Sequence, residues 1–298
     1  MGNYYIKDLE SITGIKAHTI RIWEQRYRLI SPKRTQTNIR YYDDEDVKLL
    51  LNIALLNKKG LKISKIANLT LPQIHSEALN SCKECNENDD LINSLILATY
   101  NLNEADFNKV FAEYIFKEGF ENAMLKLGFP FLQRIGDLWV SDAIHPALEH
   151  FASNIIRNKL QIAISTQTYR RTDAKKFLLF LAPGELHEIS LLFANFVISS
   201  AGHEVLYLGQ NTPVNDFESI LSIFRADYVL SIFTNCKADI DPSKFVNEIH
   251  SYHPEIKILL SGFQILSNKE KLLESFDFKE KVSILDTPHE LSAIVRNV

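Results

Sequence analysis

The sequence predicts a multidomain protein of the α and α/β classes, with an N-terminal winged helix-turn-helix, a central four-helix bundle and a C-terminal doubly wound parallel sheet. Three observations lead to this prediction. The first seventy residues hold two short helical segments separated by a glycine, the middle of the chain keeps helical periodicity, and residues 174–298 alternate short apolar runs with helical segments. A length of 298 residues fits two or three domains.

Residues 1–70 are the predicted winged helix-turn-helix domain, or head. The segments Tyr4–Ile12 and Ala17–Tyr27 have helical periodicity, and Gly14 marks the turn between them. The run 34–46 favours two strands around a polar tip and then an acidic helix start. This order of elements is typical of a DNA-binding module.

Electric charge is divided between the head and the remaining residues, the body. Residues 1–70 carry 13 Lys and Arg against 7 Asp and Glu, a net charge of +6, whereas the body carries 20 against 30, a net charge of −10. A basic head on an acidic body is typical of a DNA-binding domain joined to a part that does not touch DNA. We therefore expect double-stranded DNA to be the partner of the head.

The first half of the body is predicted to be helical. Residues 71–90 are a polar linker, and 91–168 form the expected four-helix bundle. Pro130, Gly136 and Pro146 are expected to divide the later part of the bundle into separate helices.

The second half of the body, 174–298, is predicted to be a flavodoxin-like, doubly wound parallel sheet, because short and continuously apolar runs alternate with helical segments. Ligands of such sheets bind beyond the carboxyl ends of the strands, where the loop 182–188 is expected. The predicted strands are 177–181, 205–208, 228–233, 256–260 and 282–285.

The loop 182–188 contains a candidate metal-ligand pair. Glu185 precedes His187 by two residues. A carboxylate that accepts a hydrogen bond from one ring nitrogen fixes the tautomer and leaves the other nitrogen free to bind a metal. An ordinary surface histidine near a helix start is the alternative for this residue.

The head resembles the MerR family of winged-helix regulators. The resemblance rests on T-G-I-K-A-H-T-I-R-I-W-E-Q-R-Y from Thr13 to Tyr27 and on R-Y-Y-D-D-E-D from Arg40 to Asp46. It implies that the second helix enters the major groove and that the wing contacts phosphates. The implied groove residues are Lys16, His18, Thr19 and Arg21, and the implied phosphate contacts are Lys33, Arg34, Arg40 and Tyr41.

The body resembles cobalamin-binding proteins, whose signature is D/E-x-H-x-x-G, then S-x-L, then G-G, on a flavodoxin-like domain under a helical cap. The resemblance implies a cobalamin cofactor, with His187 as its lower cobalt ligand and Glu185 in support. The implied cofactor-binding residues are Trp139, Glu149 and His150 of the bundle, Glu185 and His187 of the loop, Ser231 and Phe233 at S-x-L, and Ser261 and Gly262 at G-G.

Head and body together resemble the CarH/LitR-type regulators, in which a MerR head is joined to a cobalamin-binding body. This resemblance covers nearly the whole chain. It implies a transcriptional regulator in which the cofactor state is coupled to a homo-oligomer, a dimer or tetramer, and to operator binding. A cobalamin enzyme would need a substrate-bearing domain, typically a barrel of about 250 residues, for which this chain has no room. We therefore do not expect an enzyme.

A second hypothesis stays open, in which the same head is joined to a cobalamin-type fold that has lost the cofactor and docks a protein partner. Val140 follows Trp139 where light-sensing members have a histidine, and Ser190 and Ser261 replace glycines of the signature. These replacements favour the second hypothesis, whereas the E-x-H loop favours the first.

The composition indicates where in the cell the protein is expected and what its cysteines can do. No apolar run approaches the roughly 20 residues that cross a bilayer, so we expect no membrane partner and a cytoplasmic protein. The three cysteines are too few for a disulfide framework. Cys82 and Cys85 form one C-x-x-C pair, for which a zinc or redox role and a loop without a task are both open.

Overall fold

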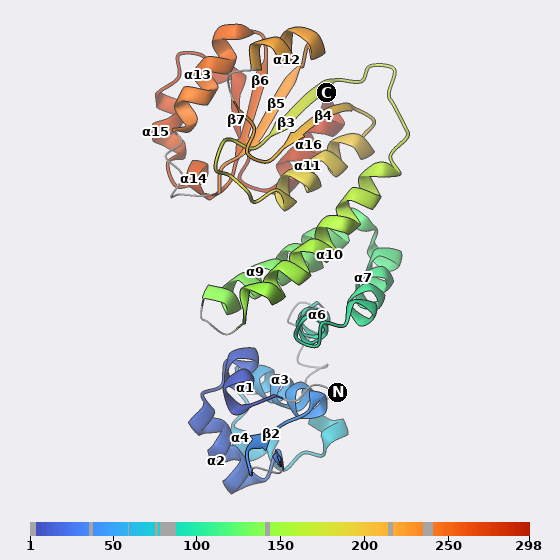
Figure 1. Ribbon diagram of the computed structural model, residues 1–298, viewed down its shortest axis with the longest axis vertical. Helices are drawn as coiled ribbons and strands as arrows, with labels where there is room; N and C mark the ends of the chain where they lie inside the picture. Colours follow the sequence, from blue (N-terminus) through green and yellow to red (C-terminus); the bar gives the residue numbers. More distant parts are fainter. Residues whose placement is uncertain are drawn as a thin grey trace. The chain divides into compact units, whose positions relative to one another are not determined.

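The computed structural model (Figure 1) describes residues 4–35, 38–58, 60–74, 77, 88–140, 144–213, 217–234 and 241–298. The three cysteines lie outside these residues, so the structure does not test a zinc or redox role of the C-x-x-C pair. The chain divides into two compact units, Met1–Ile155 and Ile156–Val298. Within the described ranges, no helix has the length and apolar character that would be needed to span a membrane.

The head has the predicted helix, turn, helix and wing. Helix α1 (Ile6–Thr13) ends at Gly14, whose positive φ of 71° directs its N–H to the carbonyl of Glu10. Helix α2 (Ala17–Tyr27) follows and buries Ile20 and Trp23. Strands β1 (Lys33–Arg34) and β2 (Arg40–Tyr41) pair antiparallel and form the wing, residues 33–41.

Further helices of the head follow the wing in the described residues. These are α3 (Asp44–Lys58) and α4 (Ile63–Ile66). Residues 71–74 of the expected linker are helical, and Ile74 is buried in the same hydrophobic cluster as Leu9 and Val47. The core of the head therefore extends past residue 70.

The helical part of the first unit corrects one expectation. Pro146 begins α10 and Pro130 lies in the first turn of α9, directly after a π-helical turn, so both prolines lie at helix boundaries as expected. Gly136 lies in the interior of α9 and does not divide it. Pro130 has no N–H, and the carbonyl of Lys126, four residues earlier, instead accepts a hydrogen bond from the Asn88 side chain at 3.1 Å. The helices are α6 (Asp89–Tyr100), α7 (Glu104–Glu118), α8 (Phe120–Ala123), a π-helical turn (Met124–Gly128), α9 (Phe129–Val140) and α10 (Pro146–Ser165).

The second unit has a five-stranded parallel sheet in the order β4-β3-β5-β6-β7, which confirms the flavodoxin-like topology. In Figure 1 the helices lie on both faces of this sheet, with α11 and α16 together on one side. The strands are β3 (Lys176–Phe180), β4 (Glu204–Gly209), β5 (Tyr228–Ile232), β6 (Lys257–Ser261) and β7 (Val282–Ile284). The helices are α11 (Ile189–Ser200), α12 (Phe217–Phe224), α13 (Pro242–Tyr252), α14 (Phe263–Leu266), α15 (Lys269–Glu274), a 3₁₀ turn (Lys279–Lys281) and α16 (Pro288–Asn297).

Two chain segments approach closely at the carboxyl edge of the sheet. Gly262, directly after β6, has a φ of 102°, and a Cβ built on it would lie 2.4 Å from the carbonyl oxygen of Phe233. Only glycine fits this position, because both the left-handed backbone and the absence of a side chain are required. The ends of β5 and β6 are thereby held together beside the loop that follows β3.

Candidate cofactor site and nucleic-acid interface

His187 lies in the loop after β3, at the carboxyl edge of the sheet, and a buried carboxylate orients its ring. Glu185 is 2% exposed, and its Oε1 lies 2.6 Å from the Nδ1 of His187. The same oxygen accepts the backbone N–H of His187 at 3.0 Å. The side chain of His187 is 66% exposed. With Nδ1 facing the carboxylate, Nε2 is the nitrogen available to an incoming group.

The rest of the loop is connected to two neighbouring strands. The second carboxylate oxygen of Glu185 accepts the backbone N–H of Thr234, just after β5, at 2.7 Å. Asn211, after β4, accepts the N–H of Gly184 through its side chain at 2.9 Å and donates its own N–H to the carbonyl of Glu185. Asn211 has a φ of 54°, a conformation that asparagine tolerates better than most residues. Sequence reasoning missed Asn211 and Thr234, which follow predicted strands as His187 does.

The residues at the S-x-L and G-G positions lie on the next two strands. Ser231 on β5 is 1% exposed, and its hydroxyl has no hydrogen-bond partner within the described ranges. Phe233 is buried and packs against Phe245 of α13. Ser261 donates its hydroxyl hydrogen to the carbonyl of Leu285 at 2.9 Å.

The bundle residues that the resemblance implied belong to α9 and α10 of the first unit. Glu149 and His150 are neighbours on α10, with 3.1 Å between a carboxylate oxygen of Glu149 and the Nδ1 of His150. The His150 side chain is exposed. Trp139 and Val140 are the last residues of α9, and their side chains lie outside what the structure describes.

Helix α2 presents the expected recognition residues to solvent. Lys16, His18 and Arg21 are exposed, and Thr19 is half-buried beside His18. Lys16 forms an exposed ion pair with Glu10 at 3.0 Å. Ile20 and Trp23 point the opposite way into the core, as their spacing predicts.

The basic residues of the wing are engaged within the head. Lys33 pairs with Asp43, and Arg40 lies 3.4 Å from Glu24 of α2. Arg34 donates to the side-chain oxygen of Asn38 at 2.7 Å. A phosphate would compete with these partners, so the structure makes Arg21 the more available cation.

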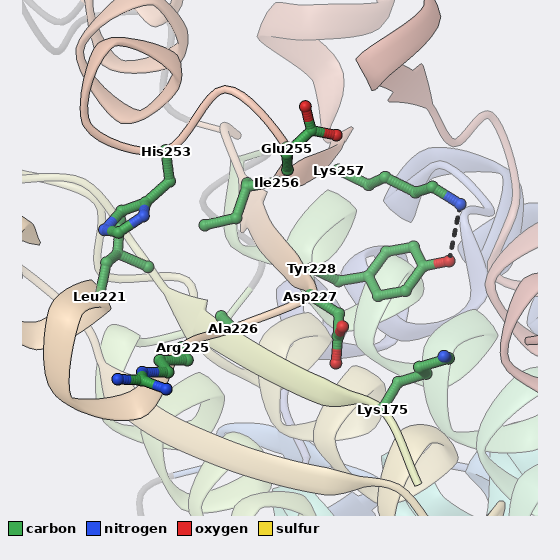
Figure 2. Close-up of a pocket in the computed structure, with 10 residues that line it drawn as sticks. All are labelled: Lys175, Leu221, Arg225, Ala226, Asp227, Tyr228, His253, Glu255, Ile256 and Lys257. Atoms are coloured by element: carbon green, nitrogen blue, oxygen red, sulfur yellow. Dashed lines mark hydrogen bonds between the residues drawn. The ribbon is translucent and has the colours of Figure 1, made fainter. Parts of the chain in front are cut away.

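A separate cavity of about 270 Å³ lies at the amino edge of the sheet, near the starts of β5 and β6. Figure 2 shows the ends of the Arg225 and Lys175 side chains on opposite sides of it, so these two cations do not converge. Lys257 donates to the Tyr228 hydroxyl at 3.3 Å. Parallel sheets bind ligands at the carboxyl edge, so His187 remains the candidate site.

Comparison with known proteins decides the class of the head. Residues 4–71 match the model of the MerR HTH family regulatory proteins. The HTH-type transcriptional repressor CarH of Myxococcus xanthus is 28% identical over 76% of this chain and 77% of its own length. The repressor CarA of the same organism is 26% identical over 81% of this chain and 79% of its own. The chain is a DNA-binding transcriptional regulator with a MerR-type head. Relatives that are named repressors agree with the expectation of a regulator rather than an enzyme.

The body of this regulator shares its fold with a corrinoid protein. The monomethylamine corrinoid protein of Methanosarcina barkeri superposes with a TM-score of 0.57, covering 70% of this chain and 99% of that protein. The sequence identity is 13%, so the likeness concerns the fold. The regulator therefore joins a MerR-type head to a body with a corrinoid-protein fold.

Proposed function

We propose that this MerR-type regulator binds a cobalamin at the carboxyl edge of its sheet, with the Nε2 of His187 as the lower cobalt ligand. The observation that carries the proposal is the pairing of an exposed imidazole with a buried carboxylate that fixes its Nδ1 at 2.6 Å. A bound cobalamin would supply a cobalt ion to which a protein nitrogen can bind, and His187 would hold it. Neutral imidazole nitrogen is a suitable donor for such an ion.

The other residues at this edge fit the same cofactor. The Ser231 hydroxyl is buried and unpaired in the described structure, so a polar ligand group reaching it would gain a hydrogen bond that the protein alone does not make. Leu186 and Phe263 are exposed apolar side chains next to His187 and Gly262. Exposed apolar side chains at a ligand edge suit the flat, apolar face of a corrin ring. Trp139, Glu149 and His150 are the proposed contacts from the bundle.

Coupling to DNA follows from linkage. If the cofactor binds one assembly state of the chain better than another, a dimer or tetramer is favoured, and operator affinity changes with it. Two or more heads on one duplex are needed because a single head makes few base contacts. The proposed base contacts are Lys16, His18, Thr19 and Arg21, and the proposed phosphate contacts are Lys33, Arg34, Arg40 and Tyr41.

Retention of hydroxocobalamin tests the cofactor proposal. The full-length protein is incubated with it in the dark, passed through a desalting column, and measured by its visible spectrum. We expect the wild type and a His289→Ala control, which removes an exposed histidine of α16, to retain the cofactor. His187→Ala should lose it. Equal retention by His187→Ala would refute the ligand assignment.

A second candidate function is the docking of a protein partner by a cofactor-free body. The observation that favours it is Ser261, whose hydroxyl is already bonded to Leu285 where the signature has glycine. Absence of retention of every cobalamin form by the wild type would favour this candidate over the first.

Binding to DNA is tested on the most available cation of α2. Arg21→Ala should weaken binding to a duplex selected from random sequences by the wild type by about 1–3 kcal/mol. Fluorescence anisotropy at fixed salt measures this loss. Arg134→Ala, on the exposed face of α9, is the control, and equal affinities of the two variants would contradict the groove assignment.

A further inference from the structure

The residue directly after His187 is held by two elements outside its own loop. Glu188 Oε1 lies 2.8 Å from Nε of Arg157 on α10. The other carboxylate oxygen accepts a hydrogen bond from the Tyr207 hydroxyl of β4 at 3.4 Å. The Glu188 side chain is only 13% exposed and that of Arg157 35%. Burial and the neighbouring Glu188 raise the pKa of Tyr207, so its phenol stays a donor.

The two carboxylates flanking His187 connect it to different parts of the fold. Glu185 connects the loop to the end of β5 through the N–H of Thr234. Glu188, the residue before the first turn of α11, accepts the N–H of Leu192 through its carbonyl and reaches α10 through its side chain. If the His187 backbone moves while Glu185 stays in place, Glu188 therefore moves with it and its ion pair with Arg157 changes.

Helix α10 is the element to which such a movement would pass. It is continuous from Pro146 to Ser165, so one helix carries Glu149 and His150 in the first unit and Arg157 in the second. A partly buried ion pair between a helix and a ligand loop is a suitable connection, because opposite charges 2.8 Å apart and partly shielded from water attract each other strongly.

We propose that Glu188 and Arg157 are positioning residues that couple the His187 loop to helix α10, so that ligation at His187 changes the order of α10. The coupling to ligation rests on the proposed cobalamin function. The connection between loop and helix does not, because the ion pair is formed by two residues of the chain itself.

Hydrogen–deuterium exchange of the full-length protein tests both statements. Arg157→Met removes the charge and keeps an aliphatic stem, Glu188→Gln keeps size, and Arg157→Lys restores charge. Arg225→Met, an exposed arginine at the amino edge of the same domain, is the matched control. Without ligand, Arg157→Met and Glu188→Gln should each raise exchange about fivefold in 186–192 and in 153–161, with β5 and β6 unchanged. The exchange rates of Arg157→Lys should lie between those of the two variants and those of the wild type.

Addition of hydroxocobalamin supplies the second arm. In the wild type and in Arg225→Met it should slow exchange in both segments, whereas in Arg157→Met it should slow exchange in 186–192 alone. Ligand protection of α10 in Arg157→Met equal to that in the wild type would overturn the transmission. If the wild type retains no hydroxocobalamin, the proposed function fails, and the ligand-free arm alone decides the connection. Ligand-free exchange in Arg157→Met that matches Arg225→Met would overturn it.

Discussion

At the scale of one residue, the buried and hydrogen-bonded carboxylate of Glu185 orients the imidazole ring of His187, the proposed cobalt ligand. A carboxylate that is almost fully buried costs free energy unless its oxygens are bonded, and here they accept two backbone N–H groups while one faces the His187 ring. The arrangement holds the loop and the tautomer together. The sequence predicts the Glu185–His187 pairing from the spacing of two residues, but not the N–H of Thr234, since that contact depends on strand order.

Replacement of this carboxylate should weaken cofactor binding without removing the ligand. Glu185→Gln keeps the size of the side chain but loses the charge that favours Nδ1–H, so we expect roughly tenfold to hundredfold weaker binding of hydroxocobalamin. Spectroscopic titration measures the dissociation constant. Glu204→Gln, at an exposed position of β4, is the control. Unchanged affinity in Glu185→Gln would mean that the carboxylate does not support ligation.

Tyr42 gives the head a pH dependence on the alkaline side. Its buried hydroxyl donates to Glu24, and burial, followed by the charge of Glu24, raises its pKa to about 12. An unfolded tyrosine titrates near 10, so between about pH 10 and 12 the unfolded chain loses this proton first. The contribution of Tyr42 to stability is thus present below pH 10 and is lost as pH rises to 12.

Tyr42→Phe should therefore make the melting temperature of the head less dependent on pH between 10 and 12. Circular dichroism melts at several pH values measure this dependence, with Tyr41→Phe, at the neighbouring half-exposed position, as the control. The same slope in the wild type and in Tyr42→Phe would contradict the role of the hydroxyl.

At the scale of elements, the sequence predicts those helices and strands that have a clear periodic pattern of apolar residues. The two helices around Gly14 and all five strands of the sheet lie within about two residues of their expected positions, because turn glycines and continuous apolar runs are local signals. The direct passage from α8 through a π-helical turn into α9 at Pro130 was not predictable in this way. It depends on a π-helical turn and on the Asn88 side chain from another helix.

Two glycine substitutions should have opposite effects. Gly262→Ala places a methyl group 2.4 Å from the Phe233 carbonyl at a positive φ, so we expect destabilisation by about 1–3 kcal/mol. Gly136→Ala adds a methyl group to α9 that would meet no atom within 4 Å apart from its chain neighbours and the nearby backbone of its own helix, so we expect stabilisation of about 0.5–1 kcal/mol. Urea unfolding measures both changes, and a shift of the same sign in the two variants would contradict this account.

At the scale of the whole molecule, the head is not isolated from the helical part of its unit. The Tyr4 hydroxyl donates to the side-chain oxygen of Asn101 at 2.9 Å, and the Tyr4 and Tyr100 rings meet edge to face at 6.3 Å. Leu97 and Tyr100 of α6 pack against the core of the head. Sequence alone could not predict this contact, since the partners are about a hundred residues apart.

A double-mutant cycle measures that contact. Tyr4→Phe and Asn101→Ala should each destabilise the protein, with a coupling of about 1 kcal/mol in the double variant, because one partly buried hydrogen bond is shared. Urea unfolding of the full chain supplies the four values. Tyr4→Phe combined with Asn108→Ala, on α7, should be additive. A coupling of zero between Tyr4 and Asn101 would show that the hydrogen bond does not join head and bundle.

The central claim concerns a single nitrogen–cobalt bond, and electron paramagnetic resonance observes it directly. Cobalamin bound to the full-length protein and reduced to the cobalt(II) state shows the lower nitrogen ligand as a splitting of its cobalt lines. With the protein labelled with ¹⁵N and the cofactor unlabelled, we predict that the triplet from ¹⁴N becomes a doublet, because the ligating nitrogen belongs to the protein, and that the doublet is lost in His187→Ala. A triplet that persists in the labelled protein would show that the cofactor keeps its own base, and would contradict the account.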